Sequence, residues 1–136
     1  MTDINAASLE SWQAWLAVEH EAVWLYGLIG GRLDDLSDEA REAWNRHRDT
    51  RDWLTAEIRS AGEEPDGAHL SYPEAAVDSL ADARRAAQTI EATVQIAALA
   101  CISDAARRSD IVAALRASAG SAALWGAKPT AFPGLS

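Results

Sequence analysis

Residues 9–33, LESWQAWLAVEHEAVWLYGLIGGRL, decide the fold of this chain. Apolar side chains recur there with the period of one face of an α-helix. The pattern predicts a helix from about Ala6 to Leu33, with an acidic residue near the middle of its apolar face. The predicted inward-facing set is Leu9, Trp12, Leu16, Glu19, Val23, Tyr26, Gly30 and Leu33.

The same period predicts three further helices, over residues 38–61, 73–107 and 110–125. Ser37 and Ser109 are suitable N-caps for two of them, and Pro73 is a suitable first residue for the other. No strand pattern and no internal repeat is present. The chain is therefore expected to be an all-α four-helix bundle that forms one domain over residues 1–136.

Residues 63–72 form the one long connection, with Pro65 and Gly67 inside it. Fully extended, this segment reaches roughly 33 Å, and the helix before it is about 36 Å long. The connection can run nearly the whole length of the bundle, or it can turn back beside the second helix. The residues themselves leave both topologies open.

Three ionisable residues, Glu19, His47 and Glu91, lie near the middle of the apolar faces of three different predicted helices. Burying such groups costs several kcal/mol unless they are paired or bind a cation. Arg51 follows His47 by one turn and Arg84 precedes Glu91 by two turns, each on the same face. Two acids, two arginines and a histidine form a nearly neutral set, which favours an ion-paired polar layer in the core. A mononuclear iron or zinc site built from Glu19, His47 and Glu91 is the alternative.

Five different short motifs follow one another along the chain: Glu19-His20, Tyr26-Gly27, HRDTRD at 47–52, Tyr72-Pro73 and AFPGL at 131–135. With this order and spacing the chain resembles the ferritin-like superfamily and, within it, an uncharacterised actinobacterial group that is a domain of unknown function. The resemblance implies a four-helix bundle with a lengthwise crossover between the second and third helices. It implies no established activity.

Iron-binding members of that superfamily use six ligands: a Glu from each of two helices and Glu-x-x-His from each of the other two. Glu19 and Glu91 match the single glutamates, and His47 matches one histidine. Trp44 stands where the glutamate before His47 would be, and residues 111–127 contain no Glu or His. We therefore expect no complete di-iron site and no cofactor.

These residues favour a non-enzymatic binding or interaction module. The rival hypothesis is a metalloprotein that uses the partial site of Glu19, His47 and Glu91 for mononuclear or rebuilt di-metal oxidation chemistry. A third hypothesis is a small-molecule carrier with a cavity around Trp44 and Gly30.

Charge and composition narrow the possible partners. The net charge of -9 argues against nucleic acid and against an anionic membrane surface, because both attract basic proteins. No apolar stretch reaches the roughly 20 residues that span a bilayer, and no signal peptide is recognisable at the N-terminus. The single cysteine, Cys101, is expected to be buried. Together these features predict a cytoplasmic protein.

The first helix carries a second apolar stripe behind the inward one, with the spacing of a heptad seam. In a monomer this stripe would leave a large apolar patch in water, which marks an interaction surface. We therefore expect a homodimer, since closed two-fold dimers are the commonest oligomers. The alternative is that the connection or the C-terminal tail with Phe132 covers the stripe. The stripe consists of Trp15, Val18, Ala22, Leu25 and Ile29.

Overall fold

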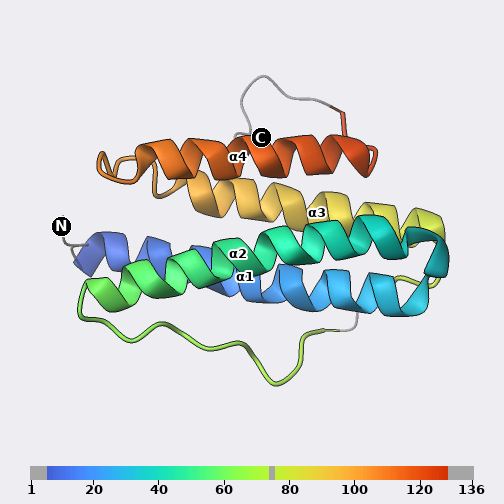
Figure 1. Ribbon diagram of the computed structural model, residues 1–136, viewed down its shortest axis with the longest axis horizontal. Helices are drawn as coiled ribbons and strands as arrows, with labels where there is room; N and C mark the ends of the chain where they lie inside the picture. Colours follow the sequence, from blue (N-terminus) through green and yellow to red (C-terminus); the bar gives the residue numbers. More distant parts are fainter. Residues whose placement is uncertain (1–5, 74–75, 129–136) are drawn as a thin grey trace.

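Four α-helices make up the computed structural model, which describes residues 6–73 and 76–128. They are α1 (Ala6–Arg32), α2 (Ser37–Ser60), α3 (Leu80–Leu99) and α4 (Arg108–Leu124), with a short 3-10 helix η1 (Asp34–Leu36) between α1 and α2 (Figure 1). Within these ranges every regular element is helical, which confirms the all-α prediction. None of these helices is both long enough and apolar enough to span a bilayer.

Helix α3 is shorter than the predicted helix over 73–107. It begins at Leu80 because Ser79 is extended and caps it, accepting a hydrogen bond from the backbone N–H of Asp82 at 3.1 Å. It ends at Leu99, and turns follow as far as Arg107. There the carboxylate of Asp104 accepts hydrogen bonds from both the backbone and the guanidinium of Arg107. These local side-chain contacts replace helical ones at both ends of the predicted segment.

The long connection crosses over lengthwise along α1. Its contacts advance in step with that helix: the side-chain amide of Gln13 bonds the backbone of Glu64 and Asp66, and Trp24 packs on Tyr72 at 5.4 Å. Helices α1 and α4 consequently run in one direction, and α2 and α3 in the other (Figure 1). Of the two topologies that the sequence left open, the structure has the crossover.

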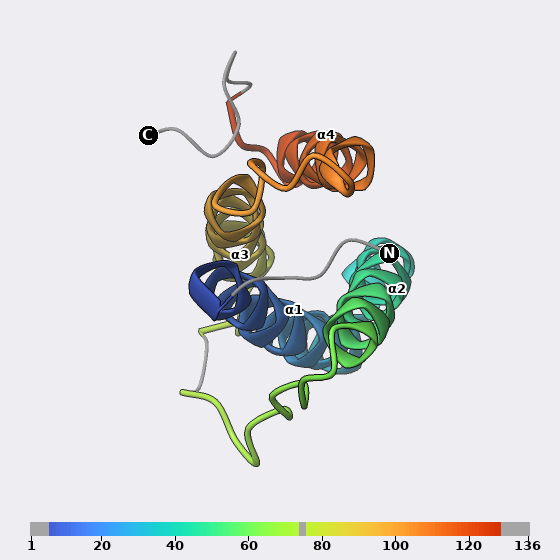
Figure 2. The same ribbon diagram turned by 90° about the vertical axis from the view of Figure 1, so that its left-hand side faces the viewer.

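Helix α1 is the central element, because it packs against α2 on one side and α3 on the other, while α4 packs on α3. Viewed along the helices, α2 and α4 stand apart (Figure 2). Two neighbours require two apolar stripes, so the second stripe of α1 lies inside the protomer. The prediction that it forms a dimer interface is wrong in its location: Trp15, Ala22, Leu25 and Ile29 are at most 5% exposed, and Val18 is partly buried. An interface between two copies would have to use another surface.

The core consists of two apolar clusters separated along the helices. The first cluster lies towards the η1 end of the bundle and includes Tyr26, Ile29, Ile90 and Trp125. The second lies towards the α3–α4 turn and includes Trp12, Trp15, Leu54, Ile58 and Ile111. Cys101 belongs to the second cluster and is 3% exposed, as predicted. Between the two clusters lies a layer of buried polar side chains.

Candidate functional site

His47 lies at the centre of the polar layer, between two glutamates. Its Nδ1 is 2.8 Å from Oε1 of Glu19 on α1, and its Nε2 is 3.0 Å from Oε2 of Glu91 on α3. All three side chains are at most 1% exposed. A row of carboxylate, imidazole and carboxylate therefore crosses the core from α1 through α2 to α3.

Glu91 is the residue on which the layer converges. Its Oε2 accepts hydrogen bonds from the Tyr26 hydroxyl at 2.6 Å and from Nη2 of Arg46 at 2.8 Å. From α4, Ser118 Oγ lies 2.8 Å from Oε1 and Ser121 Oγ lies 3.2 Å from Oε2. The Glu91 carboxylate thus ties all four helices together, including α2 and α4, which stand apart (Figure 2).

Burial, hydrogen bonds and neighbouring charges together shift the pKa values of the three residues in the layer. Burial alone would lower the pKa of His47, but hydrogen bonds to Glu19 and Glu91 and their charges raise it to about 9. Burial would raise the pKa of Glu91, but His47, Arg46 and Tyr26 lower it to about 2. Burial raises the pKa of Glu19, which has His47 as its one hydrogen-bond partner within the described residues. Glu91 is therefore ionised, and the His47 imidazolium and the Arg46 guanidinium are the positive charges that face it.

The structure brings Glu19, His47 and Glu91 into contact but leaves the two expected arginines outside. Arg51 pairs with the neighbouring Asp52 at 2.9 Å, and Arg84 is exposed on α3. A guanidinium group costs less free energy in solvent than in the core, and a long charged side chain on the flank of a helix can extend outwards to reach solvent.

Sequence reasoning missed the arginine that does enter the layer. Arg46 precedes His47 on the flank of α2 and reaches Glu91 from there, with 26% of its side chain exposed. Tyr26 and Ser118 fall on inward helical positions, so periodicity was a signal for them. Ser121 lies on the flank of α4, and no pattern in the sequence identified it or Arg46.

The residues do not fit the iron pair of the ferritin-like set. Ser118 and Ser121, three residues apart on α4, present hydroxyls to Glu91 where a Glu-x-x-His pair would present ligands. Both nitrogens of His47 are taken up by carboxylates, and an imidazolium has no lone pair for a metal. Over residues 6–73 and 76–128, no three His, Cys, Asp or Glu side chains are arranged to hold a metal ion.

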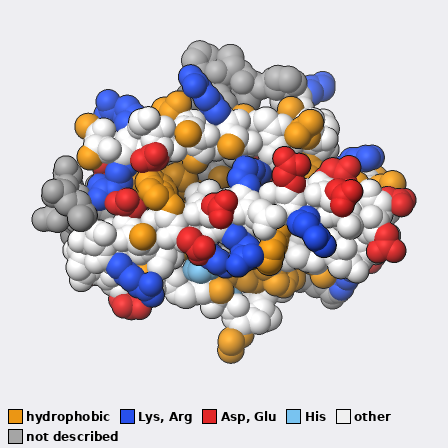
Figure 3. All heavy atoms as spheres, in the orientation of Figure 1, with side chains coloured by type: hydrophobic (Ala, Val, Ile, Leu, Met, Phe, Trp, Pro, Cys, Tyr) orange, Lys and Arg blue, Asp and Glu red, His pale blue; other side chains and the backbone are white. Residues whose placement is uncertain are grey.

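A groove of about 540 Å³ opens between α2 and α4, directly over this layer. Figure 3 views this face, where basic, acidic and hydrophobic side chains gather along the boundary between the two helices. Arg46 and Ser121, which both donate to Glu91, are part of its wall. The other lining residues are Leu36, Glu39, Glu42, Ala43, Arg84, Arg116, Ala117, Gly120, Leu124 and Trp125.

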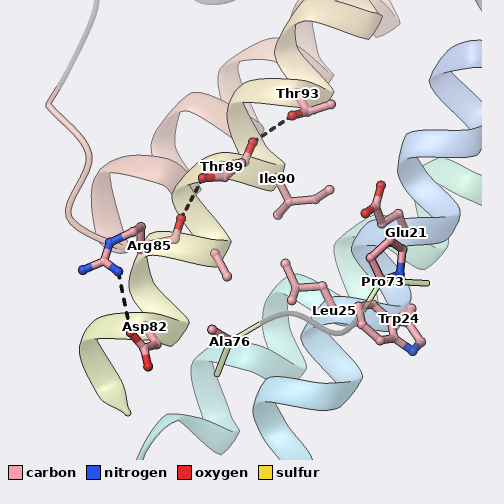
Figure 4. A pocket seen from close by; sticks show the side chains of 11 residues that line it. Glu21, Trp24, Leu25, Pro73, Ala76, Asp82, Arg85, Thr89, Ile90 and Thr93 are labelled. Carbon is pink, nitrogen blue, oxygen red and sulfur yellow. Dashed lines mark hydrogen bonds and ion pairs between the residues drawn. The ribbon is translucent and has the colours of Figure 1, made fainter. Parts of the chain in front are cut away.

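Two other hollows offer fewer polar groups to a ligand than the groove does. One of about 430 Å³ lies between α1 and α2 and is lined by Gly30 and Trp44, where the sequence predicted a cavity in the carrier hypothesis. Another of about 340 Å³ lies between α1 and α3 (Figure 4). There the hydroxyls of Thr89 and Thr93 donate to the backbone of their own helix, so they offer no free proton to a ligand.

Two comparisons with known proteins found similarities, one to a protein family and one to a solved structure. The family model described as Domain of unknown function (DUF4439) matches residues 11–136. The fold is similar to the crystal structure of a conserved hypothetical protein, Rv2844, from Mycobacterium tuberculosis. That similarity has a TM-score of 0.81 at 25% identity, covering 89% of this chain and 96% of the other. No curated protein matches the chain. The chain therefore belongs to DUF4439, a family defined as a domain of unknown function.

Proposed function

We propose that this chain is a ferritin-like binding module without a di-iron centre, and that its ligand site is the groove between α2 and α4. The observation that carries the proposal is the continuity between the groove and the buried layer through Arg46 and Ser121. At about 540 Å³ the groove falls within the range of roughly 300–1,000 Å³ that is typical of small-molecule sites.

The lining combines an apolar surface with charges that are free to act on a ligand. Leu36, Ala43 and Trp125, each at most 5% exposed, form the apolar floor of the groove, and Leu124 is 87% exposed at the rim. Within the described residues, Glu39, Glu42, Arg84 and Arg116 make no ion pair (the described pairs involve other residues). A mostly apolar pocket with a few polar groups is the common design of a small-molecule site.

The layer below the groove supports the proposal by holding its polar groups in place. Arg46 and Ser121 are oriented by the Glu91 carboxylate, which extends from α3 and accepts hydrogen bonds from the other three helices. A donor that is positioned before the ligand arrives loses less conformational entropy on binding.

A neutral fluorescent dye, N-phenyl-1-naphthylamine, tests the groove independently of charge. We expect its fluorescence to rise with saturation on the native protein and to stay low with Gly120→Trp. Gly120 lines the groove, and a Cβ added there meets nothing within 4 Å, so the indole can fill the groove without disturbing the helix. Ala123→Trp is the matched control, since Ala123 is exposed on α4 outside the groove lining. Equal dye binding by Gly120→Trp and Ala123→Trp would refute the groove as the ligand site.

A mononuclear metal site at Glu19, His47 and Glu91 is the second candidate function. The observation behind it is that His47 contacts both buried glutamates. A metal would require the three side chains to rearrange from the arrangement described above, with His47 giving up a proton and one carboxylate contact. Elemental analysis of protein purified without a His tag tests it. One equivalent of iron or zinc that disappears in His47→Gln would support the metalloprotein and count against the neutral ion-paired layer.

A further inference from the structure

We infer that the groove binds a monoanionic amphiphile of the fatty-acid type. Its carboxylate would lie at the end marked by Arg46 and Arg116, and its apolar chain would point towards Leu36 and Trp125. This inference rests on the proposed function and specifies the ligand of the same groove.

The register of α2 and α4 separates a basic end of the groove, with Arg46 and Arg116, from an end where the apolar residues Leu36 and Trp125 lie near Glu39 and Glu42. The second end is called the apolar end below. Arg46 and Ser121 both reach Oε2 of Glu91, so they mark the same level. Arg116 precedes Ser121 by about 7.5 Å, at 1.5 Å per residue. Leu36 precedes Arg46 by about 15 Å by the same measure. Because α2 and α4 run in opposite directions (Figure 1), Leu36 and Trp125 lie together on the far side of this level from Arg116.

The basic end has donors to spare. Arg46 makes one described hydrogen bond to Glu91, through Nη2, while a guanidinium has five N–H groups. Arg116 is exposed and makes no ion pair within the described ranges. Two guanidinium groups beside the Ser121 hydroxyl suit a carboxylate, whose two oxygens can accept from a planar fork of donors.

Acidic residues on α2 favour a single negative charge and fix its position. Glu42 and Glu39 precede Arg46 by about 6 and 10 Å along the helix, towards the apolar end of the groove. They would repel a second negative charge there, and Arg84 on α3 offsets this in part. The charge pattern therefore selects a molecule with one anionic head over a dicarboxylate of similar length.

Displacement of the neutral dye by three amphiphiles of equal chain length tests the inference. Dodecanoate, dodecanol and dodecylamine are compared below their micellar concentrations, at neutral pH and fixed ionic strength. We expect dodecanoate to displace the dye at a concentration about tenfold lower than dodecanol, and dodecylamine to be the weakest. Added salt should reduce the advantage of dodecanoate, since exposed charges are screened.

Arg116→Gln identifies the head-group site. It should reduce the preference for dodecanoate over dodecanol by about fivefold or more, with both displacements measured relative to the dye affinity of the same variant. Arg59→Gln is the matched control, because Arg59 is an exposed arginine of α2 outside the groove, and it should keep the full preference.

The possible failures are distinguishable. Dye that binds in the groove with no preference for dodecanoate, or with the same preference in Arg116→Gln and Arg59→Gln, overturns the anionic ligand and leaves the binding module standing. Dye binding that Gly120→Trp does not affect overturns the proposed function itself. A concentration-dependent dimer that Gly120→Trp converts to monomer in sedimentation would assign the groove to a second copy of the chain and overturn the amphiphile.

Discussion

Substitution of Glu91 tests whether the polar layer holds the four helices together. Glu91→Ala removes the carboxylate that accepts from Tyr26, Arg46 and Ser121, and it leaves the fully buried His47 with one carboxylate. Ser118 keeps the backbone carbonyl of residue 91 as an acceptor. Breaking a buried charge pair by removing one partner costs about 3–5 kcal/mol. A domain of this size is stable by about 5–15 kcal/mol, so the loss is a large share of the total.

The conservative change Glu91→Gln should lower the free energy of unfolding by less than Glu91→Ala does. Glu91→Gln keeps the shape and one acceptor oxygen but replaces the other with an amide that donates, so we expect a loss of about 1–3 kcal/mol. Urea denaturation followed by circular dichroism measures both variants against Glu10→Ala, a change at an exposed acid of α1 that should stay within about 0.5 kcal/mol of wild type. If Glu91→Ala unfolds at the same urea concentration as Glu10→Ala, the layer contributes no stability and the reasoning is wrong.

Three further results are expected. Stability should fall by up to about 3 kcal/mol as pH rises from 6.5 to about 9, because folded His47 keeps its proton after the unfolded chain has lost it, and urea titrations of wild type and His47→Gln measure this. Arg46→Ala should lower the free energy of unfolding by about 1.5–3 kcal/mol, and Arg51→Ala, whose pair with Asp52 is at the surface, by less than about 1 kcal/mol. Cys101 should react with a thiol reagent only after unfolding, because it is buried and burial raises its pKa to about 12; rapid labelling of the native protein would contradict this.

Helical periodicity by itself determined the elements and the identity of the central acids and base. Each helix is a local structure whose apolar face consists of residues spaced three and four apart in the sequence. The bounds of α1, α2 and α4 could therefore be predicted to within a few residues. A charged residue in the middle of an apolar face must be buried with a partner, and this argument identified Glu19, His47 and Glu91 as candidates before their contacts were known.

Only the tertiary structure decided which side chains complete the layer and which apolar faces are covered. Arg46 and Arg51 flank His47 on the same helix, and a long arginine side chain can turn inwards or outwards depending on what the neighbouring helices offer. The second stripe of α1 would be apolar whether a partner chain or α3 covered it, because the hydrophobic effect depends on the apolar area removed from water and not on which element covers that area. The groove between α2 and α4 likewise exists because of where two helices far apart in the chain come to rest, a distance that no local pattern of residues encodes.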